Sequence, residues 1–496
     1  MTRAIWLPAT GRTHAASRGT PPAMQENSVP TGQFGAAVPD CAAVILAAGK
    51  STRMRSRLPK PLHPLCGLPL TGHVIRSCRL AGIERSIVVI GHEGDAVRAG
   101  LGDDVEYAIQ VEQRGSGDAA KAAESALDGF SGTVVVLAGD VPLLRAETVR
   151  SLVDHHRATG AAATLLTAMF DDPTGYGRIV RNADGTVARI VEHRDATPEQ
   201  RAIREINPSI YCFESGPLFE ALHRVEPNNA QGEFYLTDVI QILSARGDCV
   251  EAIAVPDSRE TLGVNNRMEL AAVGDILRRR ILDDLMLSGV TVVDPASTWA
   301  DIEVRVGQDS TIQPHTFLLG NTLVGEDCVV GPYTRIVDST VGDRAAILAS
   351  NIVECEIGNG VKIGPYANLR PGCRLAEGVK VGDFVELKNA TLGRKVSASH
   401  LSYIGDAEVG EGTNIGAGVV TCNYDGVRKY RTIIGSRAFI GTHATLIAPV
   451  SIGDGAFVAA GSPIDQDVPA DALALARSRV TIKPQWARKR RDSQSG

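Results

Sequence analysis

The stretch Ile434–Val458 reads I-G-S-R-A-F-I-G-T-H-A-T-L-I-A-P-V-S-I-G-D-G-A-F-V, with an aliphatic residue at every sixth position. The same period runs through Val306–Val330 and Ile357–Leu387, and glycine follows many of the aliphatic residues. A strict six-residue period suits neither an ordinary helix nor paired alternating strands, but it is the repeat of a parallel β-helix. Because three hexapeptides form one coil and stacked coils bury an aliphatic column, we predict a β-helix over residues 290–486.

The first half of the chain has a different pattern. Short apolar runs at Ala42–Ala47, Ser86–Gly91 and Thr133–Ala138 alternate with stretches of helical character such as His73–Ala81. This alternation predicts an α/β domain over residues 41–265, with a Rossmann-like parallel or mixed sheet covered by helices on both faces. In such sheets the ligand lies at the carboxyl ends of the strands.

Three segments lie outside these two domains. Helical spacing in Leu270–Leu287 predicts a connecting helix within residues 266–289. Residues 1–40 are rich in Thr, Pro, Ala, Gly and Ser without a hydrophobic period. They predict a disordered extension, unless translation begins at Met24 or the segment is a transit peptide. Residues 487–496 include the basic run R-K-R-R, and we predict a solvated, disordered tail rather than a site for acidic partners.

Composition narrows the class of protein. A chain of 496 residues with 44% apolar and 22% charged residues is typical of a globular protein of two or three domains. The net charge of −6 argues against a nucleic-acid partner, and no apolar run is long enough for membrane insertion. Nine cysteines without paired short spacing favour reduced thiols in a cytoplasmic protein over a disulfide framework or a zinc site.

A cationic glycine loop follows the first predicted strand. Leu46–Lys60 reads L-A-A-G-K-S-T-R-M-R-S-R-L-P-K, in which glycine allows backbone N–H groups to approach phosphates while Arg53 and Lys60 neutralise charge. It matches neither the Walker A motif nor the dinucleotide fingerprint. Asp140 ends the strand Thr133–Ala138 and could hold a divalent ion between phosphates. Taken singly, the loop also fits a plain strand-to-helix turn, and Asp140 also fits a helix cap.

The combination of motifs is more specific. The run L-A-A-G-x-x-T-R-M followed by L-P-K resembles the nucleotidylyltransferase signature of sugar-1-phosphate pyrophosphorylases. Further blocks follow in order at Gln110–Gly117, Ala138–Leu144, Asp172–Ile179, Val191–His193, Glu205–Asn207, Asn228–Asp238 and Gly263–Arg267. The set is similar to the bifunctional N-acetylglucosamine-1-phosphate uridyltransferase / glucosamine-1-phosphate acetyltransferase family. The second half also resembles this family, at Leu369–Gly372, Asp383–Lys388, Asn414–Gly418 and Asn423–Gly426.

This resemblance implies a uridyltransferase site in the first half. The uracil nucleotide would be held by Leu46, Ala48, Gly49, Gln110, Gln113, Gly115 and Ser116. Arg53 and Lys60 would bind the phosphates of UTP as catalytic residues, and Asp140 and Asn265 would bind Mg²⁺. The amino sugar of the nucleotide product would contact Gly177, Glu192 and Asn207.

The resemblance also implies an acetyltransferase site on a left-handed β-helix. The six-residue rhythm is interrupted at Ser397–Tyr403 and at Thr421–Arg431, and function is expected at these interruptions. A lone histidine is more often structural, yet His400 is the candidate general base because imidazole titrates near neutrality. The sugar phosphate would contact Arg370, Lys388, Tyr403 and Asn414. Acetyl-CoA would contact Ala417, Asn423, Tyr424, Thr442, Ala460 and Arg477.

The chain departs from the family pattern at three places. Ser51 stands where the family usually has glycine, and Pro208-Ser209 replaces Thr-Gly. Because proline fixes its own φ and lacks an N–H, the second change affects the expected sugar pocket. Thr442 stands where serine is common and keeps the hydroxyl.

The predicted function is therefore a bifunctional synthesis of UDP-N-acetylglucosamine. Glucosamine-1-phosphate would be acetylated from acetyl-CoA, and N-acetylglucosamine-1-phosphate would then receive a uridylyl group from UTP with Mg²⁺. The family implies a homotrimer whose acetyltransferase sites combine residues of neighbouring chains. Two alternatives are a single-activity sugar-1-phosphate nucleotidylyltransferase with a scaffolding β-helix, and a trimeric regulatory subunit with degenerate sites.

Overall fold

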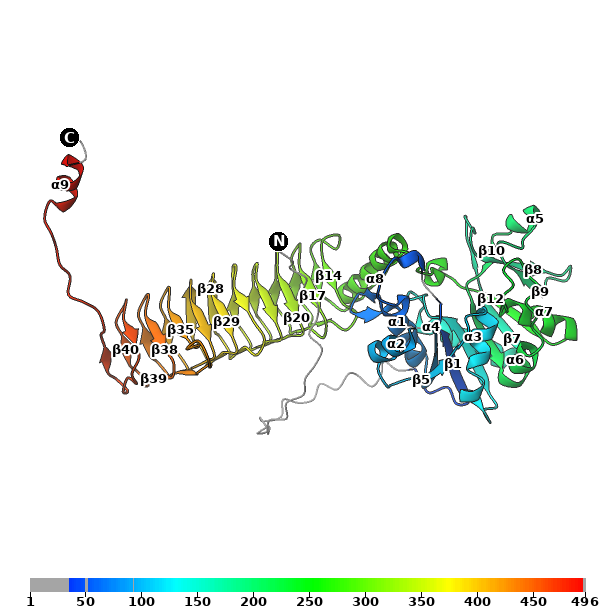
Figure 1. The fold of residues 1–496 in the computed structure, drawn as a ribbon, viewed down its shortest axis with the longest axis horizontal. Coiled ribbons are helices and arrows are strands. Elements are labelled where there is room, and N and C mark those ends of the chain that lie inside the picture. Colours follow the sequence, from blue (N-terminus) through cyan, green and yellow to red (C-terminus); the bar gives the residue numbers. More distant parts are fainter. Residues whose placement is uncertain (1–34, 50–51, 92, 494–496) are drawn as a thin grey trace.

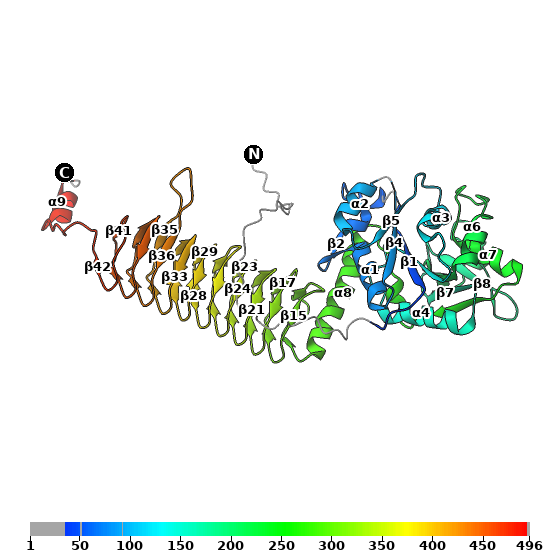
Figure 2. The same cartoon turned by 90° about the horizontal axis from the view of Figure 1, so that it is seen from below.

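The computed structural model describes residues 35–49, 52–91 and 93–493. An α/β domain forms one end of an elongated molecule and a stack of short strands forms the other (Figure 1). Helix α8 (Arg267–Leu287) lies between them, and a view turned by 90° shows the same order along the long axis (Figure 2). The departure at Ser51 and residues 1–34 lie outside the described residues.

The α/β domain is built on a ten-stranded mixed sheet with the order β5-β4-β1-β6-β11-β7-β10-β8-β9, and β12 pairs with β7. These strands are β1 (Cys41–Leu46), β4 (Arg85–Ile90), β5 (Glu106–Ile109), β6 (Thr133–Ala138), β7 (Ala163–Met169), β8 (Gly177–Arg181), β9 (Val187–Val191), β10 (Glu205–Asn207), β11 (Ile210–Glu214) and β12 (Val250–Ala254). The strands β5, β4, β1 and β6 are parallel, and the three apolar runs predicted as strands are confirmed as β1, β4 and β6.

The sheet is not parallel throughout, because β11 runs antiparallel to both β6 and β7. Strands β10 and β11 both run antiparallel to β7 and are separated only by Pro208 and Ser209. Ser209 has φ of 61°, so the two residues form a kink after which the chain pairs with β6 in place of β8. Proline cannot donate to a sheet ladder, which suits it to such an interruption. The predicted parallel or mixed sheet is therefore a mixed one, parallel from β5 to β6 and with antiparallel strands beyond β6.

Helices cover both faces of the sheet. They are α1 (Leu70–Leu80), α2 (Gly94–Leu101), α3 (Ser116–Ala122), α4 (Ala146–Thr159), α5 (Pro198–Arg201), α6 (Ser215–Leu222) and α7 (Thr237–Arg246). Alternate residues of β1 point to opposite faces, so Ala42 and Val44 join one buried cluster with α3, α6 and α7. Ala43 and Ile45 join another with α1 and α4. The helix predicted over His73–Ala81 is confirmed, although it begins at Leu70.

Several short elements border the strand ends. They are the 3₁₀ helices η1 (Thr52–Met54), η2 (Lys60–Leu62), η3 (Ser125–Leu127) and η4 (Ser258–Thr261), and the paired strands β2 (Pro64–Leu65) and β3 (Leu68–Pro69). The elements η1 and η2 hold the cationic loop that the sequence assigned to phosphate. They keep that loop next to the carboxyl end of β1.

The described chain begins earlier than the predicted domain. Val38 is buried, and its N–H donates to the Gly82 carbonyl at 2.8 Å. The Arg150 and Arg157 guanidinium groups donate to the carbonyls of Ala36 and Pro39. The prediction of disorder up to residue 40 is therefore wrong for residues 35–40, because these backbone groups are bonded to the domain.

Helix α8 connects the two domains and confirms the predicted connecting helix. The Asn266 side chain caps it by accepting from the N–H groups of Met268 and Glu269. Its buried face carries Val273, Leu277, Ile281 and Leu285 at helical spacing. This face belongs to one apolar cluster that extends from Met54 and Leu65 in the α/β domain into the β-helix. The two domains therefore share a continuous core across α8.

The C-terminal domain is a parallel β-helix with three sheets, as the hexapeptide period predicts. The first sheet contains β13 (Thr291–Val292), β16 (Thr311–Ile312), β19 (Val329–Val330), β22 (Ala346–Ile347), β25 (Lys362–Ile363), β28 (Lys380–Asp383), β31 (Ser397–His400), β34 (Asn414–Ile415), β37 (Phe439–Ile440), β40 (Phe457–Val458) and β42 (Leu473–Ala474). The second contains β14 (Trp299–Ala300), β17 (Phe317–Leu319), β20 (Arg335–Val337), β23 (Asn351–Val353), β26 (Asn368–Leu369), β29 (Glu386–Lys388), β32 (Tyr403–Gly405), β35 (Val420–Cys422), β38 (Thr445–Ile447) and β41 (Pro463–Ile464). The third contains β15 (Arg305–Val306), β18 (Leu323–Val324), β21 (Thr340–Val341), β24 (Glu356–Ile357), β27 (Arg374–Leu375), β30 (Thr391–Leu392), β33 (Ala407–Val409), β36 (Thr432–Ile434) and β39 (Val450–Ile452).

The interior of the β-helix is the predicted aliphatic column. Every aliphatic residue at the sixth positions of Ile434–Val458, Val306–Val330 and Ile357–Leu387 is buried. Neighbouring coils approach closely where glycine follows the aliphatic residue. A Cβ on Gly441, for example, would lie 2.5 Å from the Ala460 backbone nitrogen. Glycine is therefore required at such positions because a side chain there would prevent the coils from stacking.

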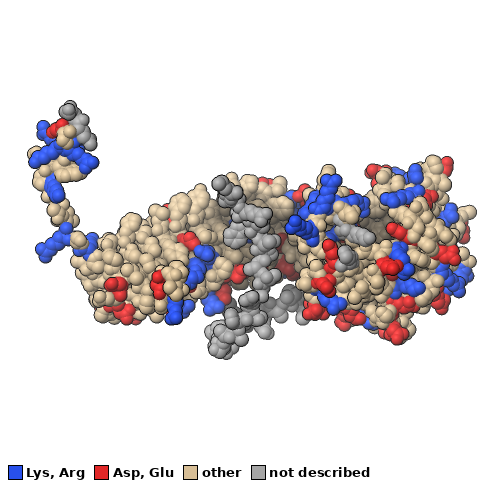
Figure 3. Space-filling model, in the orientation of Figure 1, with Lys and Arg blue, Asp and Glu red and all other residues tan. Residues whose placement is uncertain are grey.

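The C-terminal segment forms a helix where the sequence predicted disorder. Helix α9 (Trp486–Asp492) has every residue exposed, and Figure 3 shows Lys and Arg gathered on this segment. Alanine, arginine and lysine are strong helix formers, and Arg488 lies 3.9 Å from Asp492 one turn on. The prediction of a disordered tail is therefore wrong for this helix. No helix among the described residues combines the length and apolar composition that a membrane span requires.

Candidate active sites

A cavity of about 460 Å³ opens at the carboxyl ends of β1 and β6, where the fold predicts a ligand. It is lined by Leu46, Ala47, Gly49, Thr52, Arg53, Lys60, Pro61, Ser116, Ala138, Gly139, Asp140, Ser209 and Asn265. Seven of these residues belong to the predicted uridyltransferase site. Two more predicted residues, Ala48 and Gln113, line a neighbouring hollow of about 80 Å³ that shares Gly49. The structure thus gathers most of the predicted nucleotide site in one place.

Two cations and two oxygen ligands meet inside this cavity. The Lys60 ammonium contacts the Asp140 carboxylate and lies 3.3 Å from Asn265 Oδ1. Asn265 Oδ1 also accepts from the Arg53 guanidinium at 2.9 Å. The carboxylate and the amide oxygen therefore both lie beside the Lys60 ammonium, and the amide oxygen also contacts Arg53. Oxygen ligands arranged in this way fit a divalent cation such as Mg²⁺.

The oxygen set is small for a metal held by protein alone. Among the described residues no group of three or more His, Cys, Asp or Glu side chains could hold a metal ion. Mg²⁺ usually takes one or two protein oxygens and completes its shell with water and phosphate oxygens. Asp140 and Asn265 fit that coordination, with the positive groups of Lys60 and Arg53 beside them.

The base side of the site is held by hydrogen bonds between loops. Gln110 is buried, and its Nε2 donates to Gly115 O at 3.1 Å and to the Asp118 carboxylate at 2.9 Å. Gln113 Nε2 donates to Ala48 O at 2.8 Å. Gly115 has φ of 121°, and a Cβ there would lie 2.4 Å from Phe234 O. These bonds fix the loop after β5 against the loop after β1.

The three residues predicted to hold the amino sugar converge beside the cavity but do not line it. A Cβ on Gly177 would lie 3.5 Å from both Glu192 Oε1 and Asn207 Cβ. Burial raises the pKa of the Glu192 carboxyl, to which Thr237 donates at 3.4 Å. Asn207 Oδ1 accepts from the Ser209 N–H at 3.3 Å, and Ser209 lines the cavity. The kink at Pro208-Ser209 therefore joins the sugar residues to the phosphate side.

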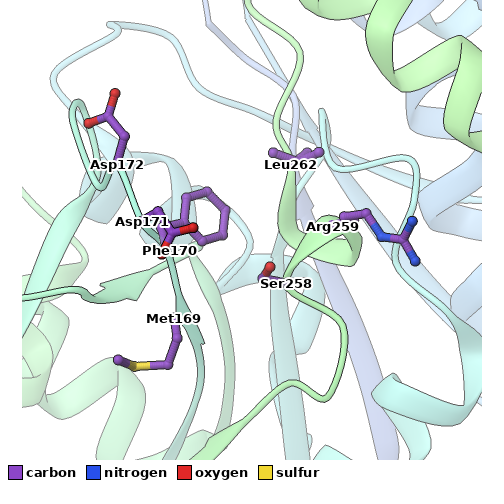
Figure 4. Close-up of a pocket in the computed structure, with 7 residues that line it drawn as sticks. All are labelled: Met169, Phe170, Asp171, Asp172, Ser258, Arg259 and Leu262. Carbon is purple, nitrogen blue, oxygen red and sulfur yellow. The ribbon is translucent and has the colours of Figure 1, made fainter.

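Another hollow, of about 260 Å³, lies between the end of β7 and η4 (Figure 4). Its lining consists of Met169, Phe170, Asp171, Asp172, Ser258, Arg259 and Leu262. None of these residues was predicted as a site residue. The Arg259 guanidinium is already paired with the Asp257 carboxylate at 2.9 Å. The predicted chemistry therefore gathers at the ends of β1 and β6 rather than in this hollow.

In the β-helix, His400 and three of the predicted acetyl-CoA residues, Ala417, Thr442 and Ala460, lie in one row, whereas Asn423 and Tyr424 lie in the loop after β35. Asp383 and His400 are paired across β28 and β31, and the interior residues that precede Ala417, Thr442 and Ala460 continue the same register. We call Asp383, His400, Ala417, Thr442 and Ala460 the turn row, because each lies at the end of a strand of the first sheet or two residues after it. Arg477 Nη1 donates to Ala460 O at 3.2 Å, which adds it to the far end of the row.

His400 is exposed at this row and makes one close polar contact. Its Nδ1 lies 2.6 Å from Asp383 Oδ1, and its side chain is 61% exposed. The hydrogen bond from His400 lowers the pKa of the Asp383 carboxyl. Exposure leaves the ring open to a substrate approaching from solvent.

The predicted sugar-phosphate residues lie beside the turn row, mostly on the second sheet. Lys388 Nζ lies 3.9 Å from Asp406 Oδ2, and the Asn423 side chain donates to the same carboxylate. Arg370 is paired with Glu386 at 3.1 Å. Tyr403 extends over Gly405, since a Cβ on that glycine would lie 2.4 Å from the phenol oxygen. Asn414 lies on the first sheet, in β34.

The loop after β35 projects from the coil stack, as its broken rhythm predicts (Figure 2). A bridge between Tyr424 and Lys429 closes it, and Asp425 Oδ1 accepts from the N–H groups of Val427 and Arg428. Tyr424 is exposed near the loop tip. The loop therefore stands over the second sheet beside Lys388.

Sequence reasoning missed three residues of this region. The adjacent Lys388 ammonium lowers the pKa of Lys429, which places two positive groups side by side. Asp406 accepts from Asn389 and Asn423, each 17 residues away. Asp383 lies 17 residues before His400. A search of the sequence for polar residues one coil apart could have found Asp383 and Asp406. For Lys429, the only sequence signal was its position in the segment that interrupts the six-residue period.

Comparison with known proteins adds two family models and several relatives. The MobA-like NTP transferase domain matches residues 43–235, and the bacterial transferase hexapeptide (six repeats) matches residues 354–389. A protein of Geobacillus sp. (strain WCH70) named "Bifunctional protein GlmU" is 50% identical over 444 residues, which is 90% of this chain and 97% of the relative. Proteins with the same name from Halalkalibacterium halodurans and Acetivibrio thermocellus are 49% and 48% identical over 448 residues, covering 90% of this chain and 98% and 97% of theirs.

Proposed function

The chain belongs to the bifunctional GlmU family, and from this premise we propose its substrates and the residues that perform its two reactions. It is a bifunctional transferase that joins a uridyltransferase domain to an acetyltransferase domain of left-handed β-helix fold. The proposed substrates are glucosamine-1-phosphate and acetyl-CoA for the first reaction, and N-acetylglucosamine-1-phosphate and UTP for the second. The product, UDP-N-acetylglucosamine, is a precursor for cell-wall synthesis.

Uridylyl transfer is proposed for the cavity at the ends of β1 and β6. An oxygen of the sugar phosphate attacks the α-phosphorus of UTP in line, and pyrophosphate leaves. Lys60 and Arg53 neutralise the phosphate charge, and Gln110 and Gln113 fix the loops around the base. Mg²⁺ held by Asp140 and Asn265 would offset the charge that develops on the phosphate oxygens. Such a site works by positioning and electrostatics and needs no covalent nucleophile.

Glu192, Gly177 and Asn207 are proposed to receive the amino sugar. Their convergence and the burial of Glu192 supply a carboxylate and an amide beside the cavity. The carboxylate and amide oxygens can accept hydrogen bonds from the hydroxyl and amide groups of the sugar. The link through Ser209 supports a sugar position next to the phosphates.

Acetyl transfer is proposed for the turn row, with His400 as general base. The amine nitrogen of glucosamine-1-phosphate attacks the thioester carbon, the C–N bond forms, and the C–S bond breaks. His400 takes the proton that the amine loses, and the CoA thiolate leaves and is then protonated. Lys388, Lys429 and Arg370 supply positive charge for the sugar phosphate. Ala417, Thr442, Ala460 and Arg477 form the row along which acetyl-CoA extends.

We also propose a homotrimer in which neighbouring chains complete the acetyltransferase sites. Tyr333, Tyr366, Phe384 and Leu401 are exposed by 57–68% at turns of one corner of the β-helix, where Ala349 occupies the turn between Tyr333 and Tyr366. Tyr366 and Phe384 stack with ring centroids 5.3 Å apart, and Leu401 follows His400 directly. An apolar row of this kind supports burial against another copy, next to the site.

A cytoplasmic location is proposed from the thiols. All nine cysteines are free, and burial raises the pKa of Cys78 to about 12. Buried, protonated thiols are slow to oxidise, and a reducing compartment keeps the rest reduced.

The observation that carries the proposal is that two polar sites, far apart along the molecule, contain the side chains that we assign to the two reactions. One sample of the full chain tests both, by CoA thiol release from glucosamine-1-phosphate and by pyrophosphate release from UTP with N-acetylglucosamine-1-phosphate. We expect His400→Ala to abolish the first reaction and spare the second, and Asp140→Ala to do the reverse. Loss of both reactions in either folded variant would contradict the two-site proposal. A chain with only the second reaction would instead support the alternative of a scaffolding β-helix.

A further inference from the structure

The contact between Asp383 and His400 joins two consecutive coils of the β-helix. The residues are register partners on β28 and β31, and Asp383 Oδ1 lies 2.6 Å from His400 Nδ1. This distance is typical of a charge-assisted hydrogen bond. Asp383 is not among the residues that the sequence assigned to either reaction.

Close packing of the two coils brings this pair together. A Cβ on Gly382 would lie 1.9 Å from the Ser399 carbonyl oxygen, so the backbone contact at this level is possible only for glycine. The Leu401 N–H donates to Asp383 O at 2.9 Å and continues the ladder past the strand ends. Asp383 is therefore held directly beside the His400 ring by the backbone on both sides of it.

The residues next to His400 on its own turn and on the following coil are uncharged. On the following coil the turn row places Ala417 next to His400, and the adjacent residues of its own turn are Leu401 and Ser402. The Ser402 hydroxyl donates to backbone carbonyls, including His400 O at 2.9 Å. Within the described residues, Asp383 is the one acidic group that lies within ion-pair distance of His400.

The contact selects one form of the neutral imidazole. An ionised carboxylate only accepts hydrogen bonds, so the bonded Nδ1 must carry the proton. The lone pair then resides on Nε2, which has no hydrogen-bond partner among the described residues. This is the form that a general base requires at the nitrogen facing away from Asp383.

We propose that Asp383 is a positioning residue for acetyl transfer, holding His400 in the tautomer whose Nε2 accepts the proton of the substrate amine. The inference rests on the proposed role of His400 as general base. As the C–N bond forms and the C–S bond breaks, the amine proton moves to Nε2 and the ring becomes an imidazolium. Asp383 stays ionised beside Nδ1–H and stabilises that cation until the proton passes to the CoA thiolate.

The test is a double-mutant cycle in the full-length protein, with CoA thiol release as the readout. We expect Asp383→Ala and Asp383→Asn to lower kcat by about tenfold, with KM for both substrates within about twofold, because a positioning partner contributes part of the roughly 10²–10⁴-fold effect of a general base. Asp383→Glu should recover part of the rate. In the His400→Ala background, Asp383→Ala should cause no further loss beyond about twofold, since a residue that acts through another has no effect once that residue is gone.

Two controls separate the possible outcomes. The first control is Asp343→Asn, at an aspartate after a strand of the third sheet. Asp343 Oδ1 accepts a hydrogen bond from the Glu326 N–H, and on the next coil Asn359 Oδ1 accepts one from the Asp343 N–H, so asparagine can make this contact. Asp343→Asn should leave both activities unchanged, as should every Asp383 variant for uridylyl transfer. An equal loss in both backgrounds, or a loss in KM alone, would overturn the positioning role, and so would full activity of Asp383→Ala. Full acetyl transfer by His400→Ala would instead contradict the proposed function itself.

Discussion

The two candidate sites are assembled over very different distances in the sequence. In the α/β domain, Arg53 meets Asn265 across 212 residues and Lys60 meets Asp140 across 80. In the β-helix, His400 meets Asp383 and Asn423 meets Asp406 across only 17 residues. The first site depends on the order of strands in a whole sheet, and the second on the register of consecutive coils. Substitutions at the two sites should therefore differ in their effects on activity and stability.

The largest expected effect concerns the distant contacts. Lys60→Ala should lower kcat/KM for uridylyl transfer by about 10³-fold, because one preorganised charge on a transferring phosphate is worth about that factor. Acetyl transfer should be unchanged. Pyrophosphate release measures the first reaction and CoA thiol release the second.

Lys121→Ala is the matched control, since this lysine is exposed on α3 outside the cavity. It should leave both rates within about twofold, as most surface substitutions do. A comparable loss in both reactions of Lys60→Ala would show that the two sites are not independent.

The next prediction breaks the coil register. Gly382→Ala places a Cβ 1.9 Å from Ser399 O, so the coils that carry Asp383 and His400 must separate. Overpacking of this kind costs about 2–3 kcal/mol. We expect the midpoint temperature for loss of acetyl transfer to fall by several degrees while that for uridylyl transfer stays the same.

Gly378 lies on the same coil and provides the control. It has φ of 69°, and the atom nearest to an added Cβ would be Cγ of the flexible Lys395 side chain, at 3.5 Å. Asparagine tolerates this left-handed backbone, so Gly378→Asn should cost less than about 1 kcal/mol. Equal effects at the two glycines would mean that coil contact does not limit stability here.

A smaller effect tests the proposal that Lys429, in the loop after β35, helps to bind the sugar phosphate. Lys429→Ala removes one of two adjacent ammonium groups and should raise KM for glucosamine-1-phosphate by about tenfold, because a charge-assisted contact to the phosphate is lost. The kcat should change little, because Lys429 does not contact His400. Initial rates at varied sugar phosphate measure the split. Arg428→Ala, in the same loop, should leave KM unchanged, and a fall in kcat alone would contradict a binding role for Lys429.

The sequence predicted the β-helix better than its side-chain contacts, for a physical reason. A six-residue aliphatic period must be buried in stacked coils, and each predicted position is buried. Which side chains meet between neighbouring coils also depends on the lengths of the loops that interrupt the period. The contact between Ala438 and Thr413 spans 25 residues because the loop after β35 intervenes, whereas that between Asp383 and His400 spans 17. Asp383 and Lys429 therefore became visible as site residues only in the structure.

The α/β domain illustrates the opposite case. Motifs located most cavity-lining residues, including Lys60 and Asp140, because strand ends and glycine loops are local signals. The direction of β11 has no local signal, since it follows from a two-residue kink at Pro208-Ser209. Likewise, two of the hydrogen bonds that hold residues 35–40 have donors more than a hundred residues away, on Arg150 and Arg157.

The smallest predicted effect is a difference in acid sensitivity between the two domains. In the α/β domain, burial lowers the pKa of His73, whose Nε2 lies 2.7 Å from Leu65 O, and burial also lowers the pKa of His156. The histidines of the β-helix, His315, His400 and His443, are all exposed.

A buried histidine whose folded pKa lies below its unfolded value near 6.5 binds a proton more readily after unfolding. The free energy of unfolding of the domain is therefore highest above pH 6.5 and decreases as the pH falls from 6.5 toward the pKa of the folded state. The slope is at most about 1.4 kcal/mol per pH unit for each such histidine. We therefore expect the α/β domain to open before the β-helix between pH 7 and pH 5. Pulse-labelled hydrogen exchange after acid incubation, read at one fixed labelling pH, measures the order.

His73→Gln keeps a donor of similar length without a titrating ring, and it should flatten the pH dependence in the α/β domain even if it lowers stability at pH 7. Protection lost first in β-helix peptides would contradict this assignment. So would an unchanged pH dependence in the variant, because the comparison attributes acid sensitivity to burial of the ring. The difference between the domains would then have to come from their carboxylates, which titrate at lower pH.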